Sequence, residues 1–257
     1  MAAASKPIIL DETGLAIAEA IRNINGIKEQ TNAGFHNSVY RGKCLGTEYS
    51  AAQKTAIQAG TFDDMFIGDY WTIGGVNYRI AAFDYWLHCG DTECTTHHVV
   101  IVPDTNLYSA KMNSSNVTTG GYVGSQMYTS NLASAKTTIK AAFGSSNILN
   151  HRDLFTNAIS GDKASGWAWY DSEVDLMNES MVYGHEAWAS HHGYETGISK
   201  SQLPLFALDP SRITNRANWW LRDVVSSATF AGVSHNGGAS YSSAGNSLGV
   251  RPAFAIC

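Results

Sequence analysis

Hydrophobic residues at every second position mark a β-hairpin near the middle of the first half of the chain. In residues 71–80, WTIGGVNYRI, they alternate with polar residues on either side of Gly74-Gly75. Two glycines supply the positive φ angles that a two-residue turn requires, so this segment predicts a hairpin. Residues 98–103, HVVIVP, form a short apolar run that ends at Pro103 and predict a buried strand.

Other segments repeat with a helical period. Residues 130–143 place Leu132, Ala135, Ile139 and Phe143 on one face, and Gly144 follows as a stop signal, so we expect a helix there. Residues 170–184, YDSEVDLMNESMVYG, predict a second internal helix, with Ser172 as its cap and Asp175 three residues further on.

The N-terminal residues 8–30 predict a helix with a narrow apolar seam. Leu10, Gly14, Ile17, Ile21 and Ile24 recur at alternating spacings of four and three, which is typical of a short coiled coil, and Ile-rich seams favour a homotrimer. The seam covers only about two heptads, and a helix docked on its own domain explains it equally well.

A few helices around hairpin-built antiparallel sheet indicate an α+β fold. The length of 257 residues fits one large domain, or one domain with a small appendage. We therefore expect an N-terminal helical region for attachment or oligomerisation at 1–65, containing a linker and a second helix, and a main domain at 66–257.

The composition narrows the class of partner. Charged residues make up only 15% of the chain and the net charge is -5, so the surface is covered largely by Ser, Thr, Asn, Gly and Tyr, as in paratopes and adhesins. Nucleic acid is not an expected partner, because there is no cluster of Lys and Arg. No apolar run approaches the length of a membrane span, so membrane insertion is not expected either.

The first residues, MAAASKPIIL, lack the basic-then-apolar pattern of a signal peptide. This predicts a product made in a bacterial cytoplasm and not exported by the general secretory route. The four cysteines, at positions 44, 89, 94 and 257, are then expected to be thiols.

The C-terminal region places two specified blocks around an unspecified stretch. The blocks are NWWLR at 218–222 and GVRPAF at 249–254, which we call the framing blocks. Between Val224 and Val250 there is no Asp, Glu, Lys or Arg, and more than half of the positions are Gly, Ala or Ser. On composition alone, this stretch reads as a solvated loop without a partner.

The framing blocks resemble those of C-type-lectin-fold proteins of phages and gut bacteria. YRIAAFDYWLHCGD, HHVVIVPD, WAWYDSEVDLMNESMVYG and GISKSQLPLF occur in a similar order in that family, and the resemblance covers roughly residues 66 to 257. Some of these proteins are the variable proteins of diversity-generating retroelements, in which an error-prone reverse transcriptase rewrites adenines of a C-terminal gene segment. The opening KPIILDETGLAIAEAI is similar to that of phage tail and structural proteins.

The resemblance implies a C-type lectin-like fold with a variable segment at about 224–250 and a scaffold on either side of it. Scaffold roles fall to Trp219, Trp220, Arg222 and Arg251, with Pro252 at a strand edge or bulge. The candidate ligand contacts within the segment are Thr229, Ser234, His235, Asn236, Ser240, Tyr241, Ser242, Ser243, Asn246 and Leu248. Tyr241 and His235 are the strongest of these, because they are amphipathic and form hydrogen bonds.

Residues 184–193, GHEAWASHHG, add three histidines, Glu186 and Trp188. A metal site or an acid–base pair is conceivable here, but we favour an exposed aromatic loop in which Trp188 contacts the ligand. A Trp188 that caps the core is the alternative.

Zinc is a weaker hypothesis for HCGDTECTTHH at 88–98. His88, Cys89, Cys94, His97 and His98 are suitable ligand types, but the spacing lacks a C-x2-C or H-x3-H pair. We expect these histidines to be structural, and no cofactor or metal is predicted.

The sequence lacks the motifs of several common enzyme classes. There is no P-loop or G-x-G-x-x-G motif, and the paired cysteines of formylglycine-generating enzymes, which share the lectin fold, are missing from the C-terminal region. A glycan-degrading enzyme needs two facing carboxylates. Asp171, Glu173, Asp175 and Glu179 are near one another, but we interpret them as helix caps and a solvated face.

These observations lead to one main hypothesis and two alternatives. The chain is expected to be a phage virion protein of the tail tip or fibre that presents a variable surface to a host cell-surface receptor, protein or glycan, and contacts other virion proteins. A purely structural capsid or tail module is the first alternative. A glycan hydrolase that depends on a carboxylate such as Glu173 or Glu186 is the second.

Overall fold

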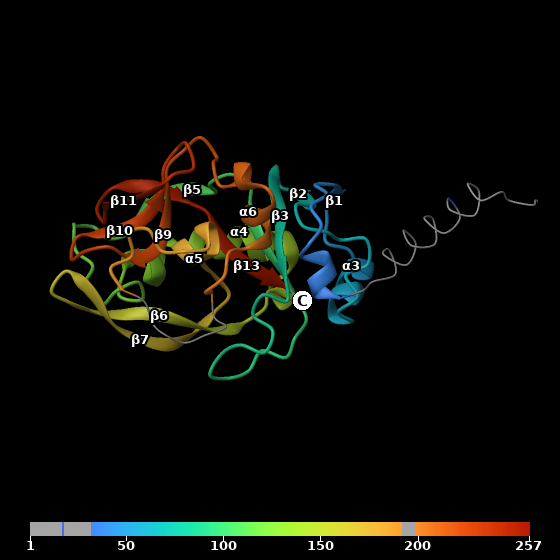
Figure 1. The fold of residues 1–257 in the computed structure, drawn as a ribbon, viewed down its shortest axis with the longest axis horizontal. Coiled ribbons are helices and arrows are strands. Elements are labelled where there is room, and N and C mark those ends of the chain that lie inside the picture. The colour runs from blue at the N-terminus through green and yellow to red at the C-terminus, as the bar shows by residue number, and fades with distance from the viewer. Residues whose placement is uncertain (1–16, 18–31, 192–198) are drawn as a thin grey trace, which may run out of the picture.

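The computed structural model describes residue 17 and residues 32–191 and 199–257, and it shows a mixed α+β fold dominated by sheet (Figure 1). The α+β class expected from the sequence is confirmed. The predicted helix at 8–30 lies, apart from Ile17, outside the described residues. The seam and the homotrimer therefore stay predictions.

The larger sheet has six strands in the order β1-β2-β3-β4-β13-β8. Its strands are β1 (Cys44–Gly46), β2 (Tyr70–Ile73), β3 (Val76–Phe83), β4 (Val99–Pro103), β8 (Val174–Leu176) and β13 (Pro252–Ile256). Strands β1 and β2 pair in parallel, and the other neighbours pair antiparallel. The C-terminal strand β13 thus lies inside the sheet, between β4 and β8.

The predicted hairpin and the predicted apolar strand are confirmed in this sheet. Ile73 lies opposite Val76, and Gly74 and Gly75 have φ angles of 58° and 80°. All five residues of β4 are buried, because β3 and β13 pair with it on either side. The expectation that Pro252 lies at a strand edge or bulge is wrong. It occupies the first position of the interior strand β13, where a proline is also tolerated.

The smaller sheet has five strands in the order β11-β10-β9-β12-β5. Its strands are β5 (Tyr108–Lys111), β9 (Trp219–Val224), β10 (Thr229–Val233), β11 (Ala239–Ser243) and β12 (Ser247–Val250). Strands β10 and β11 form a regular antiparallel hairpin, and β11 lies at one edge among the described strands. A separate long ribbon, β6 (His151–Ser160) with β7 (Lys163–Ser172), lies below this sheet in Figure 1.

The helices in the described part of the chain are short. The α-helices are α2 (Ala33–His36), α3 (Ala51–Gln58), α4 (Ala133–Phe143), α5 (Glu179–Tyr183) and α6 (Pro204–Leu208); short η turns lie at Met127–Asn131, Ser145–Asn147 and Pro210–Arg212. The apolar face predicted for α4 is confirmed, since Ala135, Ile139 and Phe143 are buried, as is Leu132 just before it. Gly144 ends the helix with a φ of 85°.

The helix predicted over residues 170–184 is wrong for most of its length. Residues up to Ser172 continue β7, and Val174–Leu176 form β8, which pairs with β13. Ser172 does not cap a helix but donates a hydrogen bond to Asp175, at 2.7 Å. Only α5 is helical, and its cap is Asn178, whose side chain accepts from the Met181 N–H. Pairing with an interior strand overrides the local helical pattern here.

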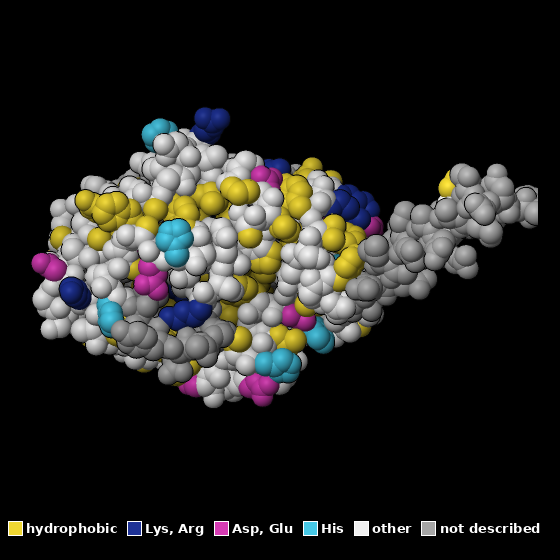
Figure 2. All heavy atoms as spheres, viewed as in Figure 1, with side chains coloured by type: hydrophobic (Ala, Val, Ile, Leu, Met, Phe, Trp, Pro, Cys, Tyr) yellow, Lys and Arg dark blue, Asp and Glu magenta, His cyan; other side chains and the backbone are white. Residues whose placement is uncertain are grey.

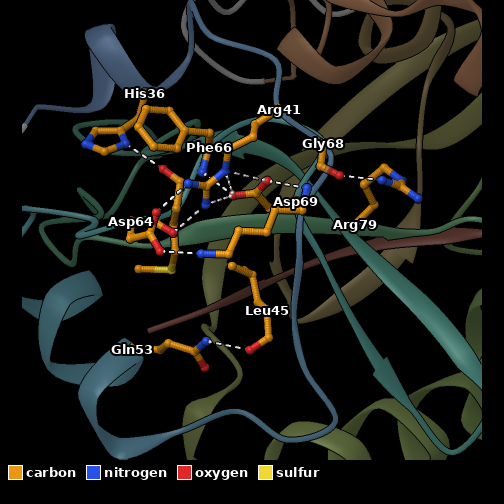
Figure 3. Close-up of polar contacts among 11 residues, drawn as sticks. His36, Arg41, Leu45, Gln53, Asp64, Phe66, Gly68, Asp69 and Arg79 are labelled. Carbon is orange, nitrogen blue, oxygen red and sulfur yellow. Dashed lines mark hydrogen bonds and ion pairs between the residues drawn. The ribbon is translucent and has the colours of Figure 1, made fainter. Parts of the chain in front are cut away.

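One buried carboxylate, shown in Figure 3, binds residues 41 and 43 to the residue just before β2. The Asp69 side chain is fully buried and accepts hydrogen bonds from Arg41 Nε at 3.1 Å and from the backbone N–H groups of Lys43 and Phe66, at 2.7 and 2.9 Å. Arg41 also pairs with Asp64. The core continues across the predicted boundary at residue 65, because β1 pairs with β2 and residues such as Ile57 and Phe62 are buried in it.

Candidate binding surface

The first framing block supplies the centre of the smaller sheet. Trp219, Trp220 and Leu221 are fully buried in β9, as their apolar size predicts. The indole N–H of Trp220 donates to the backbone oxygen of Ala110 in β5, at 2.9 Å. The two framing blocks meet directly, because Gly249 of β12 pairs with Trp219 and donates its N–H to the Asn218 backbone oxygen at 2.9 Å.

The two framing arginines are buried, and each donates to a backbone oxygen at the end of one strand, Leu176 of β8 for Arg222 and Pro103 of β4 for Arg251. Arg222 forms an ion pair with Asp153 at 2.9 Å, donates to the Leu176 backbone oxygen at 3.3 Å, and lies 4.6 Å over the Phe155 ring. Arg251 donates to the backbone oxygens of residues 103, 212 and 213 at 2.7 to 3.2 Å. Burial lowers the pKa of Arg251 to about 10.

Segment 224–250 is a hairpin with a further strand, and not a loop. In the β10–β11 pairing, Thr229 lies opposite Ser243 and Ala231 opposite Tyr241. Because successive residues of a strand point to opposite faces, Tyr241 and Ser243 lie on one face of β11 and Ser240 and Ser242 on the other. The predicted contact residues are therefore divided between two faces and the adjoining turns.

One face of the hairpin carries a small polar pocket of about 50 Å³. It is lined by Asn218, Gly232, Val233, Ser240, Tyr241, Ser242 and Leu248. Asn246 joins this group, because its side-chain amide donates to Ser242 Oγ at 2.9 Å. The pocket has room for a side-chain-sized group at most, and its walls bear no charged side chain.

The turn between β10 and β11 holds three further predicted contacts, Ser234, His235 and Asn236. Ser234 Oγ hydrogen-bonds to Asn236 and to the Gly238 backbone oxygen, and His235 is exposed. Its backbone N–H donates to the side chain of Asn218 at 2.7 Å. Thr229 and Ser243 lie at the other end of the hairpin, where Thr229 Oγ1 contacts Ser226 Oγ at 2.7 Å.

Asn218 is a residue that the sequence analysis missed as part of this surface. It was assigned to the framing block as a whole, yet it lines the pocket and anchors the His235 turn. The sequence contains a usable signal, since Asn218 is the first and only polar uncharged residue of an otherwise apolar and basic block.

Trp188 and Tyr241 lie together on the surface, and we call them the aromatic pair. Their ring centroids are 4.7 Å apart and the ring planes are inclined by 62°, which is an edge-to-face contact. The side chains are 44% and 48% exposed, so Trp188 does not cap the core. Figure 2 shows a row of hydrophobic side chains on this face of the molecule. The loop and the hairpin thus form one surface.

The four carboxylates near residue 175 do not form a solvated helical face. Asp171 is exposed and pairs with Arg152 at 3.2 Å, and Glu173 pairs with Lys140 at 2.7 Å. Asp175 is buried, accepts hydrogen bonds from Tyr122 and Ser172, and has its pKa raised to about 6 by burial. Glu179 is also buried, so the sequence interpretation fails for these two residues.

The histidines and cysteines of residues 88–98 point to separate partners. His88 pairs with Glu93 at 2.6 Å, His97 pairs with Asp84 at 2.8 Å, and buried His98 accepts the Trp86 backbone N–H at 3.1 Å. All four cysteines are free thiols, as predicted. Within the described ranges, no three His, Cys, Asp or Glu side chains converge as metal ligands.

The C-terminal part of the chain matches one family model, whose description is "Domain of unknown function (DUF6273)", over residues 168–257. The matched region contains both framing blocks, segment 224–250 and Trp188. Comparison with curated proteins and with solved structures found no match. No helix in the described part of the chain is long and apolar enough to cross a membrane.

Proposed function

We propose that this protein is a phage virion receptor-binding protein of the tail tip or fibre, with a C-type lectin-like scaffold and a variable surface at about 224–250. Binding, and not catalysis, is its mechanism. The aromatic pair is the observation that carries this proposal. Two large aromatic side chains that stay about half exposed are unusual away from a contact surface, and Trp and Tyr are the residues most enriched at binding hot spots.

The composition of the 224–250 hairpin supports a binding role. Ser243 lies on the same face of β11 as Tyr241, and Ser240, Ser242 and Asn246 provide hydroxyl and amide groups on the other face. This mixture of aromatic and small uncharged polar residues is typical of paratopes. Such side chains adapt to a partner by hydrogen bonding, while the aromatic rings supply contact area at low entropic cost.

The framing blocks explain how such a surface tolerates sequence change. Strand β9, whose tryptophans are buried, pairs with β10 of the hairpin, and Arg251 binds the backbone of other segments of the scaffold. Exposed positions of β11 carry little of the folding free energy, because substitutions away from the core change stability by only about 0.5 kcal/mol. Chemistry at the surface can therefore vary while the scaffold stays constant.

A binding assay with matched variants tests this proposal. We would measure adsorption of the purified protein to intact bacterial cells, beginning with the strain that carries the gene and continuing with related strains. Trp188→Ala and Tyr241→Ala are expected to weaken binding by at least about 10-fold, as for hot-spot residues. Leu208→Ala is the control, because Leu208 is a similarly exposed hydrophobic residue, 42%, on α6.

Equal binding by all three variants would refute the role of the aromatic pair. Substitutions across 229–248 that block particle assembly but leave adsorption unchanged would instead favour the structural module. Degradation of a surface glycan that is lost in Glu186→Gln would favour the hydrolase.

The claim of variability has its own test. We would sequence the DNA near this gene for a near-copy of the segment that encodes residues 215–254, differing almost only at adenines, beside a reverse transcriptase gene. Such a copy identifies a diversified binding protein and its variable positions. Without it, the diversification claim is withdrawn and binding has to be judged from the adsorption assay alone.

A further inference from the structure

The buried carboxylate of Glu179 lies behind the loop that carries Trp188. Glu179 is the first residue of α5 and its side chain has no exposed surface. Its Oε2 accepts hydrogen bonds from the backbone N–H groups of Ala187, Trp188 and Ala189, at 3.0, 3.0 and 2.8 Å. Its Oε1 accepts a second bond from the Trp188 N–H, at 3.1 Å. Three successive peptide groups thus converge on one carboxylate.

Glu179 is itself held from two sides. Its own N–H donates to Asp223 of β9 at 2.6 Å, so the start of α5 is fixed to the strand of the first framing block. Asn178, the residue before it, caps α5 and donates to the Ser199 backbone oxygen at 2.8 Å. The acceptor is therefore part of the rigid scaffold and not of the loop.

The far end of the loop is tied as well. Ser190 donates from its N–H and from its hydroxyl to the Val224 backbone oxygen, at 2.9 and 2.8 Å, and accepts the Ala164 N–H at 3.0 Å. Trp188 therefore stands between two anchored points, with its ring held against Tyr241. Pre-organised contact residues bind with less loss of conformational entropy.

We propose that Glu179 is a positioning residue that fixes Trp188 as a constant aromatic anchor beside the 224–250 surface. The inference rests on the proposed binding function and deepens it. Trp188 lies outside the segment expected to vary, and its holder Glu179 is buried in the scaffold. The anchor supplies the same contact to every partner, whereas Tyr241 and its neighbours supply selectivity.

The test separates the position of Trp188 from ligand binding. Protein labelled with 5-fluorotryptophan gives a ¹⁹F resonance for Trp188, assigned with Trp188→Phe. Glu179→Ala removes the acceptor, and we expect this resonance to shift or broaden while those of buried Trp219 and Trp220 stay in place. Glu179→Gln keeps one oxygen and should return the resonance toward its original position. Glu173→Ala, which removes a partly exposed ion pair, is the control and should leave the spectrum unchanged.

Adsorption to the same bacterial cells is the second readout. Glu179→Ala should weaken it roughly 3- to 10-fold through lost pre-organisation, and Glu179→Gln by less. An unchanged Trp188 resonance in Glu179→Ala overturns the proposal. If the resonance moves but Trp188→Ala binds cells normally, Glu179 still positions the loop and the proposed binding function is what fails.

Hydrogen exchange of the unaltered protein keeps the inference testable if Glu179→Ala does not fold. The amides of residues 187–189 are near the surface, but their bonds to Glu179 should slow exchange at least about 100-fold relative to an unstructured chain. Exchange at the rate of an open loop would contradict the proposal.

Discussion

The ion pair between Arg222 and Asp153 is expected to dominate the stability of the scaffold behind the proposed binding surface. Both side chains are almost completely buried and lie 2.9 Å apart. In Arg222→Met, a side chain of similar length keeps much of the packing on Phe155 but leaves the Asp153 carboxylate buried without its counter-charge. Removing one partner of a buried pair costs about 3–5 kcal/mol of unfolding free energy.

This cost should be visible in thermal and chemical unfolding. A protein of this size loses about 2–4 °C in Tm per kcal/mol, so Arg222→Met should melt on the order of 10 °C lower. Asp153→Asn combined with Arg222→Met removes the uncompensated charge. We expect the double variant to be more stable than the sum of the two single losses predicts, by at least about 1 kcal/mol.

Urea unfolding of the four proteins measures both quantities. The reasoning is refuted if Arg222→Met unfolds within about 1 kcal/mol of the unaltered protein, since that is the range of an exposed ion pair. It is also refuted if the two substitutions are additive, because the pair would then not be coupled.

Three further perturbations test other parts of the structure. Gly121→Ala should cost about 2–4 kcal/mol, because φ is 64° and a Cβ would lie 2.5 Å from the Thr156 oxygen, whereas Gly74→Ala, with φ of 58° and open space, should cost about 1 kcal/mol. Asp69→Ala should cost about 3 kcal/mol and speed tryptic cleavage between residues 41 and 54, since it removes the acceptor that binds Arg41 and the Lys43 N–H. Burial lowers the pKa of His151 from 6.5 to about 4, so the unfolded chain binds more protons in this interval and stability should fall by up to about 3 kcal/mol as pH drops from 6.5 to 4.

For each of these three perturbations, one measurement checks the expected effect and one outcome would contradict it. Melting temperatures compare the two glycine variants, and equal losses would contradict the close approach at residue 121. Limited proteolysis follows Asp69→Ala, and cleavage at the original rate would show that other contacts hold the segment. Urea unfolding at several pH values compares His151→Phe with the unaltered protein, and a pH dependence that persists unchanged in the variant would remove His151 as its source.

Local sequence patterns correctly predicted those elements in which the local preference and the tertiary contacts favour the same secondary structure. The hairpin at residues 70–83 needs only alternation and a glycine turn, and α4 needs only one apolar face. Residues 170–184 failed because their pattern is compatible with a helix, while β13, about 80 residues further along the chain, offers them a strand partner. No property of the segment itself contains that information.

The proposed binding surface could also be predicted only in part from the sequence. Trp188 and Tyr241 were each predicted as contacts from residue type, but only the folded chain places their rings 4.7 Å apart. The roles of Asn218 and Glu179 depend on backbone groups 17 and about 9 residues away, which sequence spacing does not connect. Alternation along β11 also divides the candidates between two faces, since a strand cannot present consecutive residues on one side.

By itself, the sequence determined the α+β class, the buried framing tryptophans and arginines, and the uncharged character of residues 224–250. These follow from composition and short-range periodicity, which reflect how each side chain partitions between water and a protein interior. The tertiary structure decided which strands pair, which carboxylates are buried, and which exposed side chains share a surface. Those outcomes depend on contacts between distant residues, whose free energies exist only once the chain has closed the loops between them.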